Sequence, residues 1–175
     1  RLGYTASRVI LFWLFVAPTR LFSPVRIPFA VRPEVRQTVF AVKNTIHEHL
    51  QHLRHALLDL HKTLVDSERV SYEQTMGTIP SPNHFLQLLM KDPWFAWLHP
   101  LSQLIVMMDE ALDGKEPLTP AGAQALVKQV RNLLVASEVG EGFSKHYFEA
   151  LQRDPDVVLA HARAAKYFGA PKPPV

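Results

Sequence analysis

The sequence predicts an all-α fold, a helical bundle of five or six helices with one long N-terminal helix. Through most of the 175 residues, apolar side chains recur at intervals of three and four, as they do along one face of an α-helix. At Asp92, Thr119 and Asp154 a capping residue is followed by proline, a typical helix start. No stretch alternates apolar and polar residues over a useful length, so no β-sheet is expected.

The long helix is expected to start near Pro33, to reach Asp66 and, after a break, to end at Gly77. From Ile46 its apolar residues follow a 4-3-4-3-4 spacing, a heptad seam suited to shallow packing against another helix. That helix belongs either to this chain or to a second copy. The residues in the pattern are Val39, Val42, Ile46, Leu50, Leu53, Leu57, Leu60 and Leu64.

A loop at 77–83 and a short helix at 82–91 lead to the most apolar stretch, 92–113. Pro100 lies inside this stretch and lacks an N–H, so a kink or a restart is expected near His99. Gly114 is expected to end the element in a left-handed conformation. The apolar stripe consists of Trp94, Trp97, Leu98, Leu101, Ile105, Met108 and Leu112.

Three further helices are expected after a turn at 114–118: Thr119 to about Ala136, Glu141 to Arg153, and a last one that opens at Asp154. Together, residues 33–169 are predicted to form a single helical bundle domain. Residues 170–175, which include PKPPV, are predicted to be a disordered tail.

The leading segment 1–32 differs in composition from the rest. It contains five arginines and no acidic residue, whereas the whole chain has a net charge of +3. The remainder of the chain therefore has 14 basic and 16 acidic residues, a net charge of −2. The basicity therefore belongs to this segment, and no nucleic acid partner is expected.

We interpret residues 1–32 as a non-globular or non-native leading segment. The apolar run 9–17 is too short to span a bilayer as a helix. Three origins compete: a truncated export signal, a membrane-surface arm, and upstream nucleotide sequence translated in frame. The last is favoured because the segment is periodic neither as helix nor as strand. No membrane interaction is expected for residues 33–175.

The chain has no cysteine, which excludes disulfides, thiolate metal sites and thiol nucleophiles and suits a cytoplasmic location. Ser102, Ser137 and Ser144 lie in no nucleophile-elbow motif, and no glycine-rich loop could cradle a phosphate. No catalytic residue and no cofactor are predicted. The favoured function is a non-enzymatic interaction or regulatory protein that binds a protein partner or a second copy of itself.

Six residues are the candidates for interaction. Trp94 and Trp97 are expected in the core, whereas Phe95 lies off the apolar stripe and is expected to be exposed. Aromatic residues concentrate binding energy at interfaces, which makes this region a candidate contact surface. The complete set is Trp94, Phe95, Trp97, His99, Leu50 and Leu57, the last two on the seam.

The alternative function is a metal- or cofactor-binding bundle of haemerythrin-like or ferritin-like architecture. Five of the nine histidines fall between residues 47 and 61. In helical projection they splay around the helix instead of converging, and the paired Glu-x-x-His motifs of di-iron proteins are missing, so this alternative ranks second. Its candidate ligands are His47, His49, His52, His55, His61 and His146.

The stretch DPWFAWLHPLSQLIVMMDEALD, with LHKTLVDSERVSYEQ before it and EGFSKHYFEALQRDPDVVLAHA after it, resembles a family of small bacterial helical proteins described as hypothetical. The resemblance covers about residues 45–165. That family has no established activity, so the resemblance implies no functional residues.

Overall fold

The computed structural model describes the backbone of residues 33–114 and 118–169, and the side chains within these ranges from residue 44 onward. All of these residues belong to the unit Arg32–Val175. Over them the fold is all-helical and bundle-like, as predicted. The predictions for the leading segment 1–32 and the tail 170–175 lie outside the described residues.

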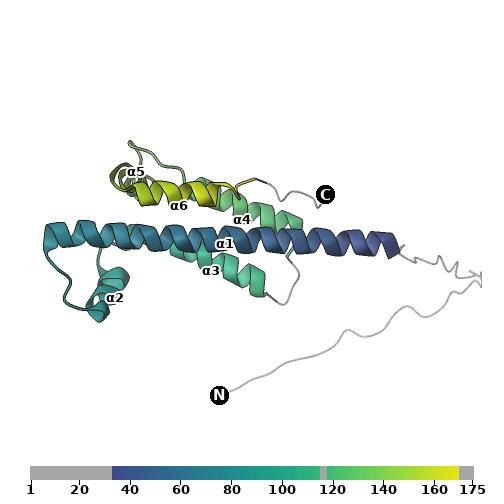
Figure 1. The fold of residues 1–175 in the computed structure, drawn as a ribbon, viewed down its shortest axis with the longest axis horizontal. Coiled ribbons are helices and arrows are strands. Elements are labelled where there is room, and N and C mark those ends of the chain that lie inside the picture. Colours follow the sequence, from purple (N-terminus) through teal and green to yellow (C-terminus); the bar gives the residue numbers. More distant parts are fainter. Residues whose placement is uncertain (1–32, 115–117, 170–175) are drawn as a thin grey trace, which may run out of the picture. The chain divides into compact units, whose positions relative to one another are not determined.

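The first helix, α1 (Pro33–Met76), is the element on which the others pack. It is 44 residues long and continuous, so the break predicted after Asp66 is wrong, whereas the end at Gly77 is confirmed. Gly77 adopts a φ of 96°, which costs glycine little because it has no Cβ. Among the helices, α6 and α3 are the main neighbours of α1, and both run beside it in Figure 1.

The apolar stretch 92–113 is divided between two elements. After α2 (Pro82–Lys91), a turn leads into the short 3-10 helix η1 (Ala96–Leu98) and then α3 (His99–Asp113). The restart predicted at His99 is confirmed, and Pro100 lies in the first turn of α3, where its missing N–H has no cost. Gly114 is extended, with φ −61° and ψ 145°, so the left-handed cap predicted there is wrong.

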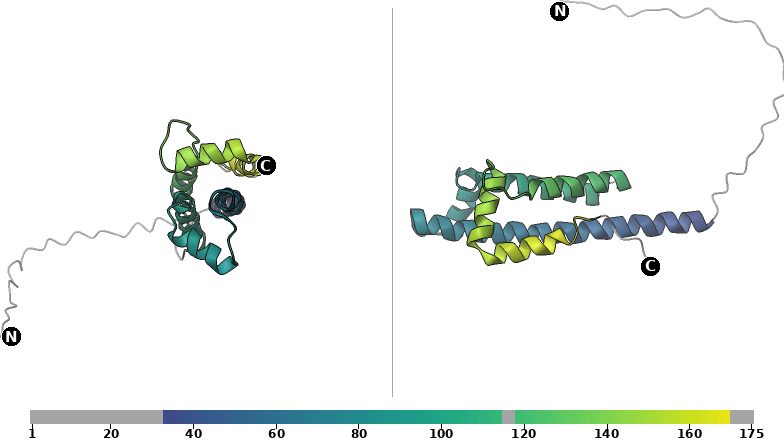
Figure 2. Two further views of the ribbon diagram at one scale, coloured as in Figure 1. Left: turned by 90° about the vertical axis from the view of Figure 1, so that its left-hand side faces the viewer. Right: turned by 90° about the horizontal axis from the view of Figure 1, so that it is seen from above.

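The remaining helices are α4 (Pro120–Leu133), α5 (Phe143–Arg153) and α6 (Pro155–Ala165). As predicted, Thr119 and Asp154 cap α4 and α6, because their side chains accept hydrogen bonds from backbone amides of the first turn. Figure 2 shows α5 crossing between α4 and α6.

The core is built on the heptad seam of α1. From residue 46 onward none of its side chains is more than 6% exposed, and each such burial contributes roughly 2 kcal/mol. Residues from α3, α4, α5 and α6 complete the same core cluster. Among the described residues, no helix is both long and apolar enough to cross a membrane.

Candidate functional site

The two tryptophans of the central stretch lie in or against the core, as predicted. Trp97 is 7% exposed, and its ring stacks on the His146 ring with centroids 5.5 Å apart. Trp94 is half-buried, and its indole N–H donates a hydrogen bond to the carboxylate of Glu68 at 3.0 Å. Each ring therefore packs on a neighbouring helix of the same chain.

Phe95 is fully buried, so the prediction that it is exposed is wrong. Its ring lies 5.4 Å from that of Tyr72 and 5.8 Å from that of Phe85. The prediction assumed α-helical projection at 100° per residue, but a turn and a 3-10 helix, with three residues per turn, occupy this region. The exposed residue is instead His99, whose ring nitrogen contacts the Leu89 carbonyl at 3.2 Å.

The seam candidates Leu50 and Leu57 are 1% and 0% exposed. They belong to the core cluster formed with the other helices of this chain. The helices that cover this seam thus belong to the same chain. A charged substitution at Leu57 is therefore expected to destabilise the folded chain, whether or not the chain self-associates.

The α1 histidines point to different neighbours. His49 contacts the Tyr167 carbonyl at 3.0 Å, and the His52 ring stacks on the Tyr167 ring with centroids 5.8 Å apart. In the part of the chain that the structure describes, no three His, Asp or Glu side chains form a group that could hold a metal ion. The other candidate ligands do not come together either. His47 contacts Gln51 at 3.0 Å, and His55 is exposed. His61 contacts Ser102, and His146 lies 3.5 Å from Glu149.

His61 and Ser102 form a hydrogen-bonded pair between α1 and α3, at 2.7 Å. Burial lowers the pKa of His61, which favours the neutral ring, so the contact with the serine hydroxyl joins two neutral groups. A serine nucleophile also needs a group that orients its base and donors for the oxyanion. No carboxylate among the described residues bonds to His61, and Ser102 also contacts the Leu98 carbonyl of its own helix. We therefore interpret the pair as a structural contact.

Glu68 is a buried carboxylate that the sequence analysis missed. It is 6% exposed, and its two oxygens accept hydrogen bonds from the Trp94 indole and the Arg153 guanidinium. These bonds connect α1, the turn before η1, and α5. A cavity of about 310 Å³ adjoins this group, with His146 and Glu149 also in its lining. Because both carboxylate oxygens are paired within the chain, and removal of one partner would leave a buried charge uncompensated, we interpret the arrangement as structural.

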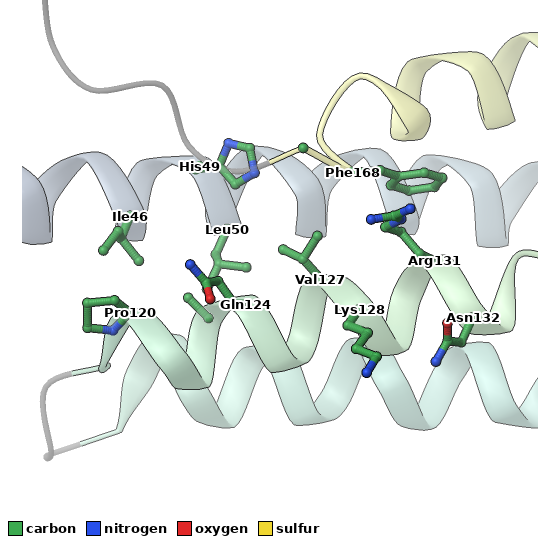
Figure 3. Close-up of a pocket in the computed structure, with 12 residues that line it drawn as sticks. Ile46, His49, Leu50, Pro120, Gln124, Val127, Lys128, Arg131, Asn132 and Phe168 are labelled. Atoms are coloured by element: carbon green, nitrogen blue, oxygen red, sulfur yellow. The ribbon is translucent and has the colours of Figure 1, made fainter.

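A mainly apolar cavity of about 360 Å³ lies between α1, α4 and the residues after α6, as Figure 3 shows. We call it the α1–α4 groove. Leu50 of α1 and Val127 of α4 form its floor, and Phe168 lies across one side. Its full lining is Ile46, His49, Leu50, Pro120, Ala123, Gln124, Val127, Lys128, Arg131, Asn132, Phe168 and Gly169.

The polar side chains of the groove are cations, amides and one histidine. Lys128 and Arg131 are both exposed and lie three residues apart on α4. None of the described residues that line the groove has a carboxylate, and neither cation forms an ion pair with a described residue. Figure 3 shows Arg131 reaching toward the Phe168 ring. An apolar groove therefore lies beside two cations that have no ion-pair partner in the described part of the chain.

Comparisons with known proteins give no match: no family model matches the chain, and neither do the curated proteins or the solved structures compared with it.

Proposed function

We propose that the chain is a non-enzymatic interaction protein that binds a protein partner through the α1–α4 groove. The proposal rests on one observation, the apolar floor bordered by Lys128 and Arg131 without a carboxylate partner among the described residues. Binding surfaces combine an apolar centre with a polar rim, and removal of apolar surface from water favours association. A cytoplasmic partner agrees with a chain that lacks cysteine.

Binding fits the groove better than catalysis does. Its described polar side chains are those of His49, Gln124, Lys128, Arg131 and Asn132, with no serine or carboxylate beside them. A general acid or base works together with groups that bind and orient the substrate within its hydrogen-bond reach, and a nucleophile needs an activating base. Grooves of this composition instead accept apolar side chains from a partner while cations fix its orientation.

The test is site-specific photo-crosslinking in cells of the source organism, with the full chain. The photoreactive residue p-benzoylphenylalanine replaces Gln124, which is exposed in the groove, or Gln129, which is exposed on the same helix outside it. We expect one protein to crosslink through position 124 and not through position 129. The substitution Asn132→Trp, at an exposed residue of the groove lining, should abolish that crosslink while helicity and unfolding midpoint are retained.

Equal crosslinking from the two positions would contradict the proposal, because it would show no preference for the groove. A crosslink from position 124 to lipids or metabolites alone would do the same. A crosslink between two copies of the chain would support a protein partner and identify it as self.

A further inference from the structure

We infer that the element of the partner bound in the α1–α4 groove is an amphipathic helix of about three turns, with carboxylates in its first turn, lying antiparallel to α4. This inference rests on the proposed function, and it adds the partner's secondary structure, charge pattern and direction.

The length of the partner helix follows from the length of the groove along α4. The groove is lined along α4 from Pro120 to Asn132. At 1.5 Å per residue this distance is about 18 Å, the length of a helix of about 12 residues. The apolar floor lies between two helices, α1 and α4, an arrangement that receives the apolar face of a third helix through residues spaced three and four apart.

The charge pattern follows from the rim. Lys128 and Arg131 are three residues apart, so they lie on neighbouring turns of the same side of α4. Two carboxylates spaced three or four residues apart on a facing helix can pair with both cations. The chain's own segment 1–32 does not match this requirement, because its five charged residues are all arginines.

The direction follows from the position of the cations. Arg131 is in the last turn of α4, near the negative end of that helix's dipole. Carboxylates are most favourable in the first turn of a helix, at the positive end of its dipole. A partner helix that places such carboxylates beside Lys128 and Arg131 therefore starts at this end of the groove and runs toward Pro120.

The experiment compares two synthetic 12-residue peptides of identical composition and apolar spacing. One has its two glutamates in the first turn and the other in the last turn, and binding to the full chain is measured by fluorescence anisotropy. We expect the first peptide to bind roughly tenfold more tightly, a preference of about 1.4 kcal/mol. The preference should weaken with added salt, because the paired charges are exposed.

Charge-reversed variants test the assigned contacts. The double variant Lys128→Glu with Arg131→Glu should remove or invert the preference between the peptides. The matched control, Lys91→Glu with Lys145→Glu, reverses two exposed cations outside the groove and should leave the preference unchanged. A spin label on the amino terminus of the first peptide should broaden backbone amide resonances near Arg131 more than those near Pro120.

Several results would overturn the inference. Equal affinity of the two peptides, or a preference unaffected by charge reversal, would contradict the charge pattern, and broadening near Pro120 would contradict the direction. Binding of dodecanoate, with no binding of either peptide, would assign the groove to a small amphipathic acid. If neither peptide binds while position 124 still crosslinks a protein, the helix inference fails and the proposed function stands. If both peptides bind outside the groove and the crosslink is absent, both fail.

Discussion

Charged side chains have different surroundings near the two ends of the part of α1 whose side chains the structure describes. Near residue 68, Glu68 is buried and paired with Trp94 and Arg153. Near residue 46, the groove beside α1 has an apolar floor and two cations, Lys128 and Arg131, that pair with no described carboxylate. Polar groups satisfied inside the chain serve its packing, whereas an apolar groove bordered by cations with no partner among the described residues is available to another molecule.

Alanine substitutions at the two ends of the seam should show the largest difference. Leu64 is 0% exposed, and Leu64→Ala should lower the free energy of unfolding by about 2–5 kcal/mol, because a cavity remains in a packed core. Ile46 borders the groove, so Ile46→Ala opens less new cavity and should cost about 1–2 kcal/mol. Urea denaturation of both variants measures the difference. Equal losses would mean that the groove end is packed as tightly as the rest.

Loss of the buried ion pair should have the next largest effect. Arg153→Met leaves the buried Glu68 carboxylate without its cation and should cost about 2–4 kcal/mol. Glu68→Gln should cost less, because the Arg153 guanidinium, 39% exposed, can still reach water. The double variant Glu68→Met with Arg153→Met should recover part of the loss in urea denaturation. Strictly additive losses would show that the two groups do not interact.

Two half-buried histidines predict a pH dependence of stability. Burial lowers the pKa of both His61 and His161 below 6.5, so the unfolded chain binds more protons than the folded chain between the lowered pKa and the ordinary value. Stability should therefore be fully present above about pH 7 and decrease as the pH falls through 6.5. Urea midpoints measured between pH 8 and pH 5 test this. The variant His61→Gln should show a shallower decrease, and an unchanged slope would exclude His61 as a source.

The smallest effect on stability is expected at the groove cations. Lys128→Gln with Arg131→Gln should change the free energy of unfolding by less than about 1 kcal/mol, because both side chains are exposed and lack an ion-pair partner among the described residues. The same variant should lose the preference between the two peptides. A large loss of stability would show that these cations serve the fold, and the contrast between the two ends of α1 would disappear.

Much of the fold was predictable because helix starts and apolar spacing are local signals. Pro82, Pro120 and Pro155 begin helices as expected, and the seam residues of α1 from Ile46 onward are buried. The helix start predicted at Asp92 is wrong, because Asp92 ends α2 and a turn follows it. The region before His99 was mispredicted because a turn and a 3-10 helix rotate side chains differently from an α-helix. This placed Phe95 in the core instead of on the surface.

The candidate site was less predictable because it depends on which helices come together. If the heptad spacing is continued past Leu64, the next two seam positions are Ser67 and Ser71. These polar residues on an otherwise apolar seam indicate a polar region beside Glu68. The partners of that region, Trp94 and Arg153, come from distant parts of the chain. For the groove no comparable signal exists, since its shape is set by how far α4 and the residues after α6 lie from α1.

The packing of α6 on α1 also determines when the helical bundle can form. α6 is the last helix in the described chain and packs on α1, and just after it Tyr167 contacts His49, 118 positions earlier in the sequence. Contacts across such long separations slow folding. During synthesis, the apolar seam of α1 leaves the ribosome long before α6 does. Until α6 has been synthesised the seam is not fully covered, and it is then accessible to chaperones and prone to aggregation.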